Sequence, residues 1–136
     1  MTKSVVETIS LHSKQFDAYN FKTQFAACIC GVQSGKTYVG AVWAVKKITE
    51  FPTGTGLIAA PTNKILQQAT LDTFFKIFPE YRRFFKEQKG VIELPEGGRV
   101  FIRSTDEPEH IEGMRLNWAW LDEAGQMKRS VWTFIR

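Results

Sequence analysis

The fold of this chain is constrained most by a short glycine-containing segment, which lies between an apolar run and a helix-like segment. Residues 31–37 read Gly-Val-Gln-Ser-Gly-Lys-Thr and end like a phosphate-binding loop. The preceding run, 25–30, is almost unbroken in its apolar character, which is typical of a buried parallel strand. The following segment, 37–51, has apolar residues at close to helical spacing. A strand, a glycine loop and a helix in this order favour an α/β fold with a phosphate site at the helix N-terminus.

The rest of the sequence continues the alternation of strands and helices. Asn63 is expected to cap a helix that ends at Pro79. The segments 91–94 and 99–103 flank Pro-Glu-Gly-Gly and have alternating polarity, which predicts a hairpin. Short apolar runs predict further strands at 57–60 and 118–121. This order of elements predicts a mostly parallel central sheet flanked by helices.

The glycine loop predicts a nucleotide site. In such loops the lysine reaches the β- and γ-phosphates and the hydroxyl holds Mg²⁺, roles that would fall to Lys36 and Thr37. The residues expected to hold the nucleotide here are Gly31, Gln33, Ser34, Gly35, Lys36 and Thr37. The strict motif has glycine where this chain has Cys30, so Gly31 would have to make the turn. The alternative is an ordinary glycine turn followed by a surface lysine.

Adjacent carboxylates follow the last predicted strand. Asp122 and Glu123 come directly after 118–121, and ligands of open α/β sheets bind at the carboxyl ends of strands. We expect Asp122 to be a Mg²⁺ ligand and Glu123 to be the general base that polarises the attacking water. Together with the glycine loop, the pair predicts nucleotide hydrolysis. The alternative for the pair alone is a solvated loop.

The composition fits one folded domain with a polyanionic partner. The chain has 136 residues, 43% of them apolar, and a formal net charge of +4. The N-terminal segment lacks the apolar core of a signal peptide, and no run is long enough to span a bilayer, so we expect a soluble intracellular protein.

Cys28 and Cys30 are expected to pack as small apolar residues of the first strand. A basic cluster could contact phosphate backbones, although a solvated helix face is the favoured interpretation; it comprises Arg82, Arg83, Lys86 and Lys89.

Several segments, taken in order, resemble the ATPase domain of the large terminase subunit of tailed bacteriophages. Lys14-Gln15 before an aromatic residue resembles the adenine-contacting segment of that family. Residues 34–37 resemble its degenerate Walker A motif, and Ala60-Pro61-Thr62 with the segment after it resembles its helicase-like region. The segments around 103–106 and 111–115, followed by Trp-Leu-Asp-Glu-Ala, resemble the approach to its Walker B motif.

The resemblance implies a fold, an activity and a set of partners. The implied fold is an ASCE, or RecA-like, P-loop NTPase that is incomplete at its C-terminal side, with residues 1–136 forming the N-terminal part of the ATPase domain and no nuclease domain. The implied activity is Mg²⁺-dependent hydrolysis of ATP that drives double-stranded DNA into a procapsid, with Gln15 contacting adenine. The implied partners are DNA, further copies in a ring, the portal and the small terminase subunit, in the host cytoplasm and without a membrane.

The sequence departs from that family at two positions that carry arginine in many relatives. Val32 and Gln33 stand where those relatives have an arginine in Walker A, and Glu112 stands where they have an arginine finger. Arg103 and Arg115 are the other candidates for a finger, with a structural or surface role as the alternative. Two other functions therefore stay open: a helicase-like DNA-dependent ATPase, and a nucleotide-binding or assembly module without turnover.

Overall fold

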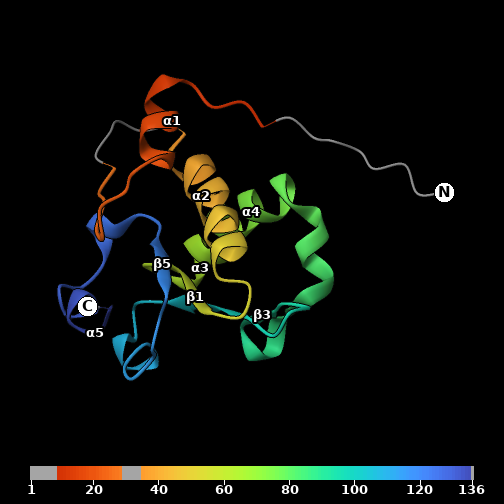
Figure 1. The fold of residues 1–136 in the computed structure, drawn as a ribbon. Coiled ribbons are helices and arrows are strands. Elements are labelled where there is room, and N and C mark those ends of the chain that lie inside the picture. The colour runs from red at the N-terminus through yellow and green to blue at the C-terminus, as the bar shows by residue number, and fades with distance from the viewer. Residues whose placement is uncertain (1–8, 29–34, 136) are drawn as a thin grey trace.

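A computed structural model describes residues 9–28 and 35–135 as an α/β fold (Figure 1). Its helices are α1 (Ser13–Tyr19), α2 (Lys36–Glu50), α3 (Asn63–Ile65), α4 (Leu71–Ile77) and α5 (Ser130–Ile135). Its strands are β1 (Thr55–Ala60), β2 (Phe85–Lys86), β3 (Val91–Glu93), β4 (Arg99–Ser104) and β5 (Trp118–Leu121). Short 3-10 helices cover Pro79–Phe84, Glu87–Lys89, Pro108–His110 and Ala124–Gln126.

The five strands form one sheet in the order β2-β3-β4-β1-β5. Strand β1 lies parallel to both of its neighbours, so that Ala59 is opposite Arg103 of β4 and Leu121 of β5. The hairpin strand β3 is antiparallel to β4, and the short β2 extends that antiparallel edge. The predicted hairpin and parallel core are both confirmed. The parallel core brings the carboxyl ends of β4, β1 and β5 to the same edge of the sheet.

Strand β1 is buried on both faces, which explains its continuous apolar sequence. Ile58 and Ala60 belong to the larger core, which α2 and α4 complete on one face. Leu57 and Ala59 point to the other face and pack with Ile111 and with Val131 of α5. Figure 1 shows this layering, with α2 and α4 on one side of the sheet and the blue C-terminal segment beyond β5.

The predicted helix after β1 is present, with two differences. Its N-cap is Thr62 rather than Asn63, because the Thr62 hydroxyl accepts the hydrogen bond from the Ile65 amide at 3.2 Å. A π-helical turn, Leu66–Thr70, separates α3 from α4, and the Leu71 amide donates to the Leu66 carbonyl. The residues buried along this helix still form one stripe: Leu66, Thr70, Leu71, Phe74, Phe75 and Phe78.

The prediction of a first strand over 25–30 is wrong for the residues that the structure describes. Residues 25–28 are exposed and have no regular secondary structure, and Cys28 is exposed rather than packed. Residues 29–34 lie outside the described part. A buried strand needs a neighbouring strand to pair its backbone groups. Among the described strands, β5 pairs only with β1, so residues 25–28 do not extend the sheet beside β5. An apolar run by itself therefore did not suffice to predict a strand.

Helix α1 was not predicted from the sequence. Its N-cap is His12, whose Nδ1 accepts from the Gln15 amide at 3.4 Å, while the Gln15 Oε1 accepts from the His12 amide at 3.1 Å. This reciprocal capping box starts the helix. His12 and Gln15 therefore form one structural unit.

The basic cluster lies on a 3-10 turn and the segment after it, not on an α-helical face. Arg82 and Arg83 are exposed, and their guanidinium groups lie 4.9 Å from the ring centres of Phe75 and Phe84. Within the described ranges, no helix combines the length and apolar character needed to cross a bilayer.

Candidate nucleotide site

The N-terminus of α2 is fixed by the conformation of Gly35. This residue is the N-cap of α2 with φ of 79°, a left-handed conformation that favours glycine. An added Cβ would also overlap the Gln15 amide nitrogen. Lys36 and Thr37 therefore start the first turn of α2, where the helix dipole and the N-terminal amide groups favour an anion. The phosphate-binding role of this segment stays a prediction.

The tertiary structure brings Thr37 to Asp122 across 85 positions of sequence. The Thr37 hydroxyl lies 3.2 Å from Oδ1 and 3.3 Å from Oδ2 of Asp122. Asp122 follows β5 directly, and its amide donates to the Ala59 carbonyl of β1 at 2.9 Å. The two residues predicted to share a metal ion are therefore neighbours. The solvated-loop alternative fails for Asp122, which is only 4% exposed.

Close packing of α2 on β5 sets this distance. Gly40 of α2 lies against the indole of Trp120, so an added Cβ would overlap Nε1 and Cε2 and lie 2.6 Å from Cζ2. Trp120 is itself buried, and so is Trp118 of the same strand, whose ring meets Trp43 edge-on at 6.1 Å. Trp118 and Trp120 belong to the core, and the partly buried Trp43 packs against it. The small residue at position 40 lets the helix bring Thr37 within reach of Asp122.

Asp122 is a buried carboxylate whose charge is only partly compensated by the residues that the structure describes. Burial raises its pKa above 3.8, hydrogen bonds from Thr70 and Thr37 lower the pKa, and the negative charge of Glu123 raises it again. Among the described residues, no ion pair involves Asp122. A buried carboxylate of this kind is stabilised when a cation binds to it.

Thr70 is a site residue that the sequence analysis missed. It ends the π-helical turn, is fully buried, and donates its hydroxyl to Oδ2 of Asp122 at 2.7 Å. The only sequence signal was a threonine inside an otherwise apolar helical stripe, between Leu66 and Phe74. That pattern does not reveal which residue of another segment the hydroxyl contacts.

Glu123 has an unusual backbone conformation. Its φ is 53° and its ψ is 40°, and it is the one non-glycine residue with positive φ among the described residues. This left-handed conformation costs about 1–2 kcal/mol for a residue with a Cβ. The side chain is exposed, and its Oε2 accepts from Gln126 Nε2 at 3.3 Å. In this conformation Glu123 is exposed while the preceding Asp122 is buried.

Gln15 lies beside the end of the glycine loop. Its side chain is 9% exposed, and its Nε2 donates to the Gly35 carbonyl at 3.1 Å while its Oε1 accepts from the His12 amide. The amide group therefore connects α1 to the residue that starts α2. The role of Gln15 towards adenine stays a prediction, as do the roles of Lys36 and Glu123. Gly31, Gln33 and Ser34 lie outside the described residues.

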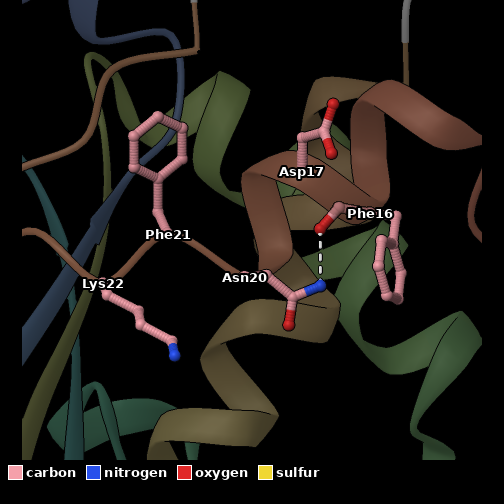
Figure 2. A pocket seen from close by; sticks show the side chains of 5 residues that line it. All are labelled: Phe16, Asp17, Asn20, Phe21 and Lys22. Atoms are coloured by element: carbon pink, nitrogen blue, oxygen red, sulfur yellow. Dashed lines mark hydrogen bonds between the residues drawn. The ribbon is translucent and has the colours of Figure 1, made fainter.

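A surface hollow of about 650 Å³ lies at the C-terminal end of α1 (Figure 2). It is lined by Phe16, Asp17, Asn20, Phe21 and Lys22. Figure 2 shows that the rings of Phe16 and Phe21 do not face one another, and that Asn20 Nδ2 donates to the Phe16 carbonyl, at 2.9 Å. Gln15 does not line the hollow, and the polar groups of the lining residues do not converge on one point. We therefore assign no nucleotide base to the hollow.

The two remaining arginine candidates differ in their surroundings. One Nη of Arg103 donates to the Gly90 carbonyl at 2.6 Å and to the Ile102 carbonyl at 2.8 Å, and burial lowers its pKa. Its guanidinium thus holds the turn before β3 against β4, which favours the structural alternative. Arg115 is exposed. Among the described residues, no three His, Cys, Asp or Glu side chains cluster as metal ligands.

Two solved structures share the fold. Both are the large terminase ATPase domain of Thermus phage P74-26, one of them an arginine-to-alanine mutant, with TM-scores of 0.71 and 0.70 and identities of 19% and 20%. Each match covers 91% of this chain, whereas this chain spans 57% and 58% of the two structures. At such identities the likeness concerns the fold alone. No curated protein sequence matches the chain significantly.

A match to a protein-family model identifies the family of this chain. Residues 28–133 match the N-terminal region of the T4likevirus-type large terminase subunit. This match runs from the end of the apolar run before the glycine loop to α5, and so includes Thr37, Thr70 and the Asp122-Glu123 pair. It covers well over half of the chain, and the chain therefore belongs to the phage large terminase subunit family.

Proposed function

We propose that this chain binds ATP with Mg²⁺ and hydrolyses it as part of a motor that packages double-stranded viral DNA. The observation that carries the proposal is the approach of the Thr37 hydroxyl to the buried Asp122 carboxylate, at 3.2 Å. The hydroxyl comes from the helix that follows the glycine loop, and the carboxylate comes from the end of β5. This is the pairing of parts that phosphoryl-transfer sites use.

The donor set fits Mg²⁺. Thr37 and Asp122 supply hard oxygen atoms, and protein sites for Mg²⁺ use one or two carboxylates together with substrate phosphates and water. The absence of an ion pair to Asp122 among the described residues also favours a cation there. Thr37 and Asp122 would hold the ion, which would neutralise charge on the phosphates.

The remaining residues have separate tasks in this proposal. Lys36 and the amide groups at the start of α2 bind the phosphates, with Gly31, Gln33, Ser34 and Gly35 completing the loop, and Gln15 is our candidate for adenine. Glu123 accepts a proton from the attacking water molecule as the oxygen of that water bonds to the γ-phosphorus. The bond from that phosphorus to the bridging oxygen breaks, and ADP leaves with the bonding electron pair.

The DNA, ring, portal and small-subunit partners belong to the same proposal, as does action in the bacterial cytoplasm. The family supports them, and the net charge of +4 suits a polyanionic partner. The exposed basic cluster is our candidate for contact with the DNA backbone; it comprises Arg82, Arg83, Lys86 and Lys89.

The test is phosphate release from the purified chain with Mg²⁺ and ATP, with and without duplex DNA. Glu123→Gln should keep nucleotide binding and lose about 10²–10⁴-fold in rate, the usual contribution of a positioned general base. Glu96→Gln, which makes the same change at an exposed hairpin position, is the matched control. Lys36→Ala should weaken ATP binding itself.

Three results would contradict parts of the proposal. Unchanged turnover in Glu123→Gln would remove that residue from catalysis. Tight binding without phosphate release in the wild-type chain would favour a nucleotide-binding or assembly module. Strand separation of a duplex substrate that depends on ATP would favour the helicase-like alternative.

A further inference from the structure

The hydroxyl of Thr70 forms the shortest hydrogen bond to the candidate metal ligand. Thr70 Oγ1 is 2.7 Å from Asp122 Oδ2, compared with 3.2 and 3.3 Å for the two contacts of Thr37. Thr70 lies outside both nucleotide-binding segments, on the helix that follows β1. A third part of the chain therefore contacts the carboxylate.

The two threonines contact the carboxylate differently. Thr37 is near both oxygens of Asp122, whereas Thr70 bonds only to Oδ2. A carboxylate offers about four acceptor positions, so a single hydrogen bond at Oδ2 leaves Oδ1 available to another ligand. Thr70 can keep its bond while the Thr37 hydroxyl turns to a different partner.

The local backbone supports a specific role for Thr70. A threonine inside a helix commonly bonds back to a carbonyl of the preceding turn, but this hydroxyl crosses to Asp122. Thr70 also ends a π-helical turn, a rare feature that is frequent at functional sites. Its exposed fraction is 0%, so water cannot replace the hydroxyl if it is removed.

We infer that Thr70 is a positioning residue, which holds Oδ2 of Asp122 and would leave Oδ1 available to Mg²⁺ bound with the nucleotide. The inference rests on the proposed function, because it concerns the same metal site. Thr70 acts through Asp122, which its hydroxyl contacts directly. Partners that orient a metal ligand commonly change metal affinity by 10–100-fold when they are removed.

The test measures the Mg²⁺ dependence of nucleotide binding, which does not require turnover. A fluorescent ATP analogue is titrated into the chain at increasing Mg²⁺ and also with excess EDTA. Thr70→Val removes the hydroxyl at nearly constant volume, and Thr70→Ser keeps it. Thr105→Val is the matched control, because Thr105 is also buried and its hydroxyl has no hydrogen-bond partner among the described residues.

We expect Thr70→Val to raise the Mg²⁺ concentration for half-maximal binding by about tenfold or more. Binding in EDTA should not change, and Thr70→Ser should stay within about threefold of wild type. Thr105→Val should match wild type at every Mg²⁺ concentration. In an Asp122→Asn background, Thr70→Val should have no further effect, since the residue acts through Asp122.

A merely structural role predicts a different pattern. Thr70→Val would then lower the thermal stability and weaken binding equally with Mg²⁺ and with EDTA, and that result would overturn the inference. An unchanged Mg²⁺ dependence would also overturn it, while leaving the proposed function intact. Failure of the wild-type chain to bind the analogue at all would overturn both. If Thr70→Val does not fold, Thr70→Cys, with its weaker donor, replaces it in the same comparison.

Discussion

Replacing Gly40 by alanine should weaken the fold, although alanine is the better helix former. Gly40 lies inside α2, where its Cα faces the indole of Trp120 on β5. An added methyl group would overlap Nε1 and Cε2 of that ring and lie 2.6 Å from Cζ2. Since Trp120 is buried, the ring has little space in which to move away.

Two opposing effects determine the size of the change. Glycine to alanine within a helix contributes about 1 kcal/mol of stability from propensity alone. Overpacking a core costs about 1–3 kcal/mol, and a direct overlap with a buried indole belongs at the upper end of that range. The free energy of unfolding should therefore fall by about 1–2 kcal/mol.

Urea unfolding followed by circular dichroism measures this change. Gly125→Ala is the matched control, because an added Cβ there meets nothing within 4 Å. A Trp120→Leu background removes the indole, and in it Gly40→Ala should stabilise the chain by up to about 1 kcal/mol. The sign of the effect thus depends on the residue at position 120.

An equal or higher stability of Gly40→Ala in the wild-type background would refute this reasoning. It would mean that α2 does not lie against Trp120 as closely as the structure has it. The same substitution should also weaken binding of ATP with Mg²⁺, because moving α2 away from β5 separates Thr37 from Asp122. Intact binding in a destabilised variant would show that this separation does not follow.

Three further predictions concern the strained, buried and arginine positions. Glu123→Gly should raise the free energy of unfolding by about 1 kcal/mol, since glycine adopts positive φ without strain, while phosphate release is lost; an unchanged or lower stability in urea unfolding would mean that the conformation is not strained. Asp122→Asn should stabilise the chain in Mg²⁺-free buffer at pH 7, because burial raises the pKa of Asp122 and its ionised form opposes folding. This gain in thermal stability should disappear below about pH 3.8, where the carboxyl group is protonated in the folded and unfolded states alike; a gain that persists there would have another cause. Arg103→Ala should cost about 1–3 kcal/mol, because the carbonyls of Gly90 and Ile102 lose a charged donor; unchanged stability with a large loss of ATP turnover would instead favour the arginine-finger alternative.

Local sequence patterns predicted the elements that have local causes. The spacing of apolar residues predicted α2, and the alternation around Pro-Glu-Gly-Gly predicted the hairpin of β3 and β4. The end of the helix before Pro79 also followed from local chemistry, because proline lacks the amide that a helix needs. These predictions were correct because each depended on neighbours within a few residues.

Predictions that needed a partner elsewhere in the chain were less successful. The apolar run before the glycine loop predicted a strand, but its described residues, 25–28, have no neighbouring strand and are exposed. Thr70 was missed as a site residue, because its hydroxyl contacts Asp122, 52 positions further along the chain. Residue types alone did not reveal that residues 25–28 form no strand or that Thr70 contacts Asp122.

In the candidate site, too, some features follow from local sequence and others from tertiary contacts. The sequence by itself determined which groups could bind phosphate and metal, because Gly-Lys-Thr before a helix and Asp-Glu after a strand carry their chemistry locally. Only the tertiary structure decided that Thr37 and Thr70 converge on one buried carboxylate, since that contact requires α2 to pack against Trp120 and the helix after β1 to place its π turn beside β5. Such distances depend on the packing of side chains from three separate segments, and no single segment encodes them.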